Sequence, residues 1–175
     1  RSALGNVIAG LEFKGVKKSE AIEKGRHWLR RVGLAGFEDS YPHHLSGGMR
    51  KRVSMAQTLI MDPDIILMDE SFSALDIQTR QLMENLLLDL WSGEKKAVLF
   101  ITHDLDEAIS MSDRVIVMSA GPASHPIGEF LIDLPRPRDV TEVRGDPRFV
   151  SLHRSIWNVL REEVLKGYEN QMQRK

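Results

Sequence analysis

The sequence predicts an α/β fold, in which a helical part precedes a mostly parallel sheet and a long helix closes the chain. Two unbroken apolar runs, residues 65–68 and Ala97–Ile101, are typical of strands buried on both faces of a parallel sheet. Stretches with helical periodicity alternate with these runs, which is the pattern of an α/β core. The 175 residues, 42% of them apolar, suffice for one domain with a C-terminal appendage.

The first sixty residues predict helices. Apolar residues recur at helical spacing over residues 4–11. Ser19 is expected to cap a second helix that Gly33 ends, because serine favours the start of a helix and glycine its end. A third helix begins at the double glycine of residues 47–48 and ends before residues 62–63, Asp-Pro.

The remaining elements follow the two apolar runs. Asp76 is expected to cap a helix whose apolar stripe includes Leu82, and residues 105–109 form another amphipathic helix that leads to a strand at residues 115–118. A short strand in GEFLID and the stiff stretch LPRPRD precede a last helix that starts at Asp-Pro, residues 146–147. We therefore expect three parts, residues 1–62, 63–120 and 121–175.

Composition excludes several functional classes. The chain has 24 basic and 25 acidic residues, so it lacks the basic excess that binding to nucleic acid usually requires. Cysteine is absent, which excludes disulfides and thiolate metal sites and favours a reducing, cytoplasmic compartment. The longest apolar runs are far too short to span a membrane, and the beginning RSALGNV has no signal-peptide pattern. If the protein works at a membrane, another chain supplies the span.

Two carboxylates follow the first predicted strand. At the carboxyl end of a parallel strand, side chains reach the crevice where such sheets bind ligands. Asp69 suits a magnesium role through water, because Mg²⁺ prefers oxygen ligands and keeps part of its hydration shell. Glu70 suits a general base that deprotonates an attacking water. The simpler alternative is that two acids end a strand at the surface.

Histidines occur in two settings. His103 follows the second predicted strand, so we expect it at the same sheet edge as Glu70, where it would contact a γ-phosphate or hold the attacking water. The alternative is a structural or surface histidine. The adjacent pair His43 and His44 is a weak metal signal in a loop, and we expect both to be solvated.

A serine and two glycines open the third predicted helix. Gly47 and Gly48 let the backbone approach an anion, Ser46 adds a hydroxyl, and the positive end of the helix favours negative charge. Alone, this tripeptide is more often a turn. Its weight comes from the signals that follow it in order: the strand ending in Asp-Glu, then SALD, then Thr-His-Asp.

This ordered set resembles the second half of an ATP-binding cassette (ABC) ATPase, the nucleotide-binding subunit of ABC transporters. LSGGM, which begins at Leu45, resembles the signature motif, IILMDE the Walker B motif, SALD the D-loop, and His103 the switch histidine. GEFLIDLPRPRD and GDPRFVSLHRSIW resemble the C-terminal extension of importers for nitrate, sulfonate, taurine and related solutes.

The resemblance implies an incomplete P-loop NTPase core that uses ATP and Mg²⁺. The residues implied to contact ATP are Leu45, Ser46, Gly47, Gly48 and Asp76. The implied partners are a second ATPase subunit in a homodimer, a transmembrane permease that meets the helical part, and indirectly a substrate-binding protein. The implied location is peripheral, on the inner face of the cell membrane.

The sequence departs from the family pattern in four respects. Ser71 stands where proline is common, and His44 where an acidic or amide residue is common. The phosphate loop Gly-x-x-x-x-Gly-Lys-Ser/Thr does not occur, nor does the glutamine loop. In the family, the signature of one subunit faces the phosphate loop of the other. We therefore expect this chain to be part of a longer subunit, unable alone to bind or hydrolyse ATP.

Two other interpretations remain open. One is a non-catalytic interaction module that docks on a membrane permease or a related ATPase subunit. The other is the signature half of a chromosome-maintenance or repair ATPase, although such proteins carry long coiled coils and no heptad run occurs here.

Overall fold

The computed structural model describes residues 1–93 and 96–172. The chain divides into two compact units, one from Arg1 to Ile101 and one from Thr102 onwards. The expected division into residues 1–62, 63–120 and 121–175 stays a prediction. Within the described ranges, no helix combines the length and apolar character that crossing a membrane requires.

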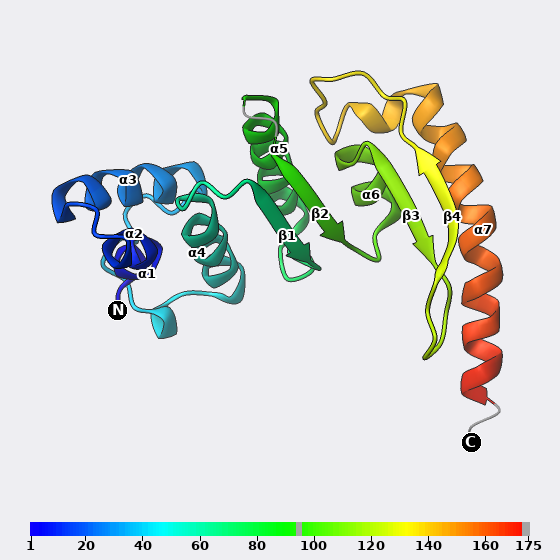
Figure 1. Ribbon diagram of the computed structural model, residues 1–175, viewed down its shortest axis with the longest axis horizontal. Coiled ribbons are helices and arrows are strands. Elements are labelled where there is room, and N and C mark those ends of the chain that lie inside the picture. The colour runs from blue at the N-terminus through cyan, green and yellow to red at the C-terminus, as the bar shows by residue number, and fades with distance from the viewer. Residues whose placement is uncertain (94–95, 173–175) are drawn as a thin grey trace. The chain divides into compact units, whose positions relative to one another are not determined.

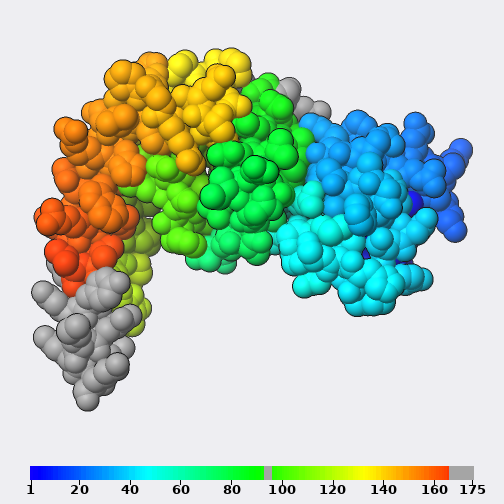
Figure 2. Space-filling view, turned by 180° about the vertical axis from the view of Figure 1, so that it is seen from behind, coloured from blue at the N-terminus to red at the C-terminus, as the bar shows by residue number. Residues whose placement is uncertain are grey.

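Helices form the beginning of the first unit, drawn in blue and cyan in Figure 1. They are α1 (Ala3–Val7), α2 (Ala9–Phe13), α3 (Lys18–Arg31), the 3-10 helix η1 (Pro42–His44) and α4 (Gly47–Leu59). Figure 2 shows their side chains as a closely packed surface in the same colours. Gly25 permits close packing of α3, because a Cβ atom there would lie only 2.4 Å from Ile8 Cγ2.

The predicted cap of α3 is wrong, whereas its predicted end is confirmed. The helix begins at Lys18 after Lys17, which makes no side-chain cap hydrogen bond, so Ser19 lies inside the first turn. The Lys17 carbonyl oxygen already accepts from the Ala21 N–H at 2.9 Å, so the helix starts two residues before the expected cap. At the other end Gly33 adopts φ of 68°, the left-handed conformation that ends helices.

The first unit also contains β1 (Ile65–Asp69), α5 (Ile77–Gly93) and β2 (Ala97–Ile101). The strands pair in parallel, as predicted, with Asp69 opposite Ile101. Burial on both faces is wrong: Met68 is 6% exposed, but Leu67 is 73% exposed. Successive side chains point to opposite faces of a strand, and this unit covers only one face.

The helix α5 begins as predicted, and its predicted apolar stripe is buried only in part. The Thr79 N–H donates to Asp76 Oδ1 at 3.0 Å, so Asp76 caps the helix. Met83 and Leu87 are buried, whereas Leu82, which we expected on the apolar stripe, is 66% exposed. Leucines occur on more than one side of this helix, so periodicity alone did not identify the buried side.

The second unit contains α6 (Leu105–Met111), β3 (Arg114–Met118), β4 (Pro126–Leu131), η2 (Val143–Gly145) and α7 (Pro147–Met172). The strands β3 and β4 pair antiparallel, and Figure 1 shows α7 alongside them. Helices, a strand and the segment after β4 all contribute to the core of this unit. Its buried residues are Ile109, Val115, Val117, Ile132, Leu134, Phe149 and Ile156. The predicted strand within GEFLID and the helix start at Pro147 are confirmed, and the whole is an incomplete α/β core.

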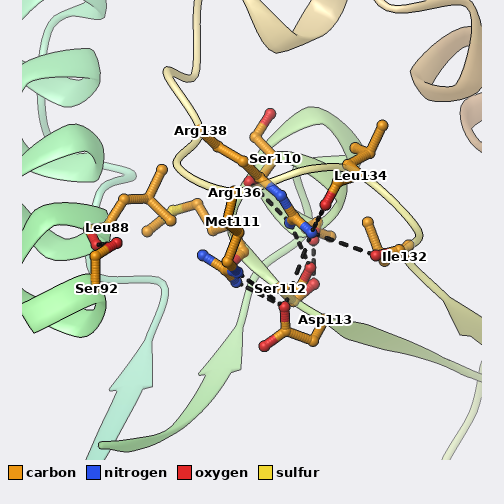
Figure 3. A network of polar contacts seen from close by, with 11 residues as sticks. Leu88, Ser92, Ser110, Met111, Ser112, Asp113, Ile132, Leu134, Arg136 and Arg138 are labelled. Carbon is orange, nitrogen blue, oxygen red and sulfur yellow. Dashed lines mark hydrogen bonds and ion pairs between the residues drawn. The ribbon is translucent and has the colours of Figure 1, made fainter. Parts of the chain in front are cut away.

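The stretch LPRPRD supplies a buried arginine to this unit (Figure 3). The guanidinium of Arg138, whose side chain is only 1% exposed, donates to four backbone carbonyls. The distances are 3.3 Å to Ser110, 2.7 Å to Ser112, 3.3 Å to Ile132 and 2.9 Å to Leu134. Arg138 thus joins the end of α6 to the chain after β4.

Two arginines, Arg136 and Arg138, lie near one carboxylate, Asp113, in this part of the unit. Burial, and to a smaller extent the positive charge of Arg136, lower the pKa of Arg138 to about 10, although the negative charge of Asp113 acts in the opposite direction. Arg138 is still protonated at neutral pH and can therefore donate all these bonds. Arg136 binds Asp113 Oδ1 through Nε at 3.0 Å and Nη2 at 2.8 Å.

Candidate functional site

The predicted phosphate-binding tripeptide lies at the start of α4. Ser46 is the N-cap, and its Oγ accepts from the Met49 N–H at 3.2 Å. Gly47 faces open space, since no atom lies within 4 Å of where its Cβ would be. The first N–H groups of an α-helix have no partner within the helix, so this end suits an anion. Leu45 is 4% exposed and anchors the segment in the core, and its contact with ATP stays a prediction.

The second glycine brings this helix start against the SALD segment. A Cβ atom on Gly48 would lie 3.4 Å from Leu75 Cδ2 and 3.9 Å from the Ala74 carbonyl oxygen. Leu75 is itself buried. Two segments that the sequence singled out separately, LSGGM and SALD, therefore adjoin within one unit.

Asp76 ends the SALD segment and is held as an anion. Hydrogen bonds from the Thr79 N–H and then from its side chain lower the pKa of Asp76, and the charge of Arg52 acts in the same direction. Its carboxylate serves as the cap of α5. The structure therefore assigns Asp76 a helix-capping contact, and its contact with a nucleotide stays a prediction.

The two acids at the end of β1 differ in backbone conformation. Asp69 is the last residue of the strand, and Glu70 follows with φ of 44°, in the left-handed region that residues other than glycine seldom adopt. The Glu70 N–H donates to the Ile101 carbonyl oxygen at 2.9 Å, and its own carbonyl oxygen accepts from Ser73 Oγ at 2.9 Å. Both carboxyl side chains are exposed. Such strain is characteristic of functional sites, and nothing in the sequence had indicated it.

These acids suit a magnesium ion bound together with a substrate. Among the described residues, no cluster of three or more histidine or acidic side chains could form a metal cage. Mg²⁺ commonly binds one or two carboxylates, with water and phosphate oxygens completing its shell. The exposed carboxylate of Asp69 fits that requirement.

His103 belongs to the second unit, just before α6. It borders an open concave region of about 460 Å³, together with Asp104, Leu105, Asp106, His153, Trp157 and Leu160. The α6 N-cap is Asp104, whose side chain accepts from the N–H groups of Asp106 and Glu107. His103 therefore lies on a segment fixed to the start of a helix. Because Glu70 belongs to the first unit and His103 to the second, the expectation that both lie at one sheet edge stays a prediction.

The adjacent histidines at the end of η1 are exposed to solvent, as expected. His43 and His44 are exposed, with their ring centroids 4.0 Å apart. Tyr41 stacks on His43 at 5.9 Å. This aromatic group precedes the start of α4 without forming a metal-binding set.

Comparison with known proteins agrees with this arrangement. The ABC transporter family profile matches residues 6–73. An uncharacterised ABC transporter ATP-binding protein of Methanocaldococcus jannaschii is 51% identical over 168 residues, covering 95% of this chain and 61% of its own length. The chain belongs to the family of ABC transporter ATP-binding proteins.

Other similarities extend this ABC assignment. An aliphatic sulfonates import ATP-binding protein of a Mycobacterium species is 45% identical over 166 residues, covering 94% of this chain and 65% of its own length. A solved ATP-binding cassette, a dimer in a post-hydrolysis state with ADP and phosphate, matches with a TM-score of 0.61 and 34% identity. That match covers 66% of this chain and 51% of the solved one. The chain thus spans about three fifths of the length of these relatives, and the fold is an incomplete ABC-type P-loop NTPase core.

Proposed function

We propose that this chain is part of the ATP-hydrolysing subunit of an ABC importer, which couples ATP binding and hydrolysis to uptake of a small nitrate-, sulfonate- or taurine-like solute. One observation carries the proposal. The start of α4 adjoins the SALD segment, within the same unit as a parallel strand that ends in Asp69 and a strained Glu70. Similarity to a sulfonate import protein supports the choice of solute.

Each site residue then has a chemical role. Ser46, Gly47 and Gly48 would offer a hydroxyl and backbone N–H groups to the phosphates of an ATP held by a second subunit. Asp69 would hold Mg²⁺ through water, and the ion offsets negative charge on the phosphoryl oxygens. Glu70 would take the proton of the attacking water, and His103 would contact the γ-phosphate or that water.

Partners follow from the same proposal. A second ATPase subunit completes the nucleotide site, and a transmembrane permease docks on the helical part at the inner face of the membrane. Phe13, the last residue of α2, is 93% exposed and suits such a docking contact, as does Phe37, which is 42% exposed. A substrate-binding protein acts indirectly, through the permease.

The 175 residues alone should be inactive. They contain no Gly-x-x-x-x-Gly-Lys-Ser/Thr pattern, whose lysine and N–H groups hold the phosphates in P-loop enzymes. A second candidate is a non-catalytic module that docks on a permease or a related subunit, which the exposed Phe13 would also suit.

The test uses a subunit completed with a phosphate-loop part. Glu70→Gln should lower ATP hydrolysis by about 10²-fold or more, because the amide keeps the shape but cannot accept the proton. ATP binding should persist, and ATP should become trapped between two paired subunits.

Asp69→Asn is the matched comparison. It should weaken Mg²⁺-dependent binding instead, because it removes a charge beside the ion. Unchanged hydrolysis in Glu70→Gln would refute the assignment of the base, whereas no hydrolysis by the completed native subunit would favour the non-catalytic module.

A further inference from the structure

Glu107 is an acidic residue in the interior of the second unit. It is 4% exposed on α6, where Ile109 and Ser110 are also buried. Burying a carboxyl group is unfavourable unless hydrogen bonds replace its contacts with water. An apolar residue would complete the buried side of this short helix without that penalty, so a specific contact of Glu107 is expected.

That contact is Thr102. Thr102 Oγ1 donates to Glu107 Oε2 at 2.6 Å, a short distance typical of strong hydrogen bonds. The same Oγ1 accepts from the Asp104 N–H at 3.0 Å. Because Glu107 takes the hydroxyl hydrogen, a lone pair of the oxygen is directed at Asp104. One hydroxyl thus joins the residues on either side of His103.

Asp104 adds a second attachment to the same helix. Its Oδ1 accepts from the Asp106 N–H at 2.9 Å and from the Glu107 N–H at 3.3 Å. The far end of α6 is held by Arg138, which donates to the carbonyls of Ser110 and Ser112 (Figure 3). Both neighbours of His103 are therefore bonded to a helix that is itself fixed at its other end.

We infer that Thr102 and Glu107 are positioning residues that hold the His103 backbone in place for hydrolysis. The inference rests on the role proposed above for His103. Neither residue is assigned a contact with ATP. Small displacements of a positioned group cost large factors in rate, so loosening this segment should reduce turnover more than ATP affinity.

The experiment measures ATP hydrolysis in the completed subunit, with single-turnover rates extending the range for slow variants. Thr102→Val removes the hydroxyl but keeps the shape, and Glu107→Ala removes its acceptor. Each should lower kcat by about tenfold or more while KM for ATP stays within about twofold. Thr102→Ser and Glu107→Gln retain a donor and an acceptor, and should keep kcat within about threefold of the native value.

A double-mutant cycle with His103→Ala separates positioning from general stability. If Thr102 acts through His103, Thr102→Val should have no further effect in the His103→Ala background. An equal loss in both backgrounds would overturn the inference. Ile109→Val is the control, because it loosens the same helix without touching these bonds and should leave kcat within about twofold.

The cycle also tells the two ideas apart. If His103→Ala lowers kcat while Thr102→Val does not, the positioning inference is overturned and the role of His103 stands. If His103→Ala leaves kcat unchanged, the role proposed for His103 fails and the inference fails with it.

Discussion

Glu70 and His103 follow neighbouring strands, but they are held in different ways. Glu70 is fixed by its backbone, with φ of 44° and an N–H bond to the Ile101 carbonyl. His103 is fixed by side chains, since Thr102, Asp104 and Glu107 form hydrogen bonds on both sides of it. The position of Glu70 therefore depends on its own backbone conformation, whereas the position of His103 depends on hydrogen bonds to α6.

The largest expected effect is on the support of α6. Arg138→Met keeps much of the side-chain volume but leaves several buried carbonyls without their charged donor. The free energy of unfolding should fall by about 3 kcal/mol, because such carbonyls are costly to leave unsatisfied. Urea denaturation monitored by far-UV circular dichroism measures this.

The matched control for this support is Arg148→Met. Arg148 is about half exposed and forms an ion pair with Asp146, two residues before it. Arg148→Met should lower the free energy of unfolding far less than Arg138→Met does, because exposed ion pairs contribute little to stability. Equal losses in the two variants would show that burial of Arg138 does not stabilise the unit.

A smaller effect of opposite sign is expected at Glu70. Glu70→Gly should raise the free energy of unfolding by about 0.5–1 kcal/mol, since glycine adopts positive φ without strain. Asp69→Gly, in the regular strand beside it, should instead lose about 0.5–1 kcal/mol. Thermal denaturation of the two variants, compared side by side, tests whether Glu70 is held in a strained conformation. A loss of stability in Glu70→Gly would contradict the comparison.

The smallest expected effect on stability concerns Asp76, which caps α5. Hydrogen bonds from Thr79 hold the pKa of Asp76 below its ordinary 3.8, so the folded state binds this proton less readily than the unfolded state. The stabilising contribution is complete above pH 3.8 and is lost as the pH falls further. Asp76→Asn should therefore match the native chain at neutral pH and show a shallower loss of stability in acid. Parallel pH profiles for both chains would refute this.

Local signals were read correctly from the sequence. The cap at Asp76, the helix end at Gly33 and the parallel pairing of the two apolar runs depend on residues close in the chain or on strong composition. The prediction of Ser19 as a cap was wrong, because the first hydrogen bond of the helix already runs from the Ala21 N–H to the Lys17 carbonyl oxygen.

The sequence did not predict features that depend on contacts between distant residues or on an unusual backbone conformation. The left-handed backbone at Glu70 has no residue-type signal, because glutamate rarely adopts it. Arg138 lies in a stretch whose sequence gave no sign of burial, and the carbonyls of Ser110 and Ser112 that it binds are 28 and 26 residues away. Glu107 lies on an amphipathic helix, where an acidic residue is expected to face solvent, and its bond to Thr102 is a contact that the sequence did not predict.

The central claim is that these residues act on ATP whose phosphates another part of the protein holds. The most direct test measures Mg²⁺-ATP binding and turnover by the purified 175-residue chain, alone and after mixing with a phosphate-loop part of an ABC subunit. The account predicts no binding or turnover above background for the chain alone, and turnover that depends on Glu70 once the phosphate loop is supplied. Robust turnover by the chain alone, free of contaminating ATPases, would contradict it.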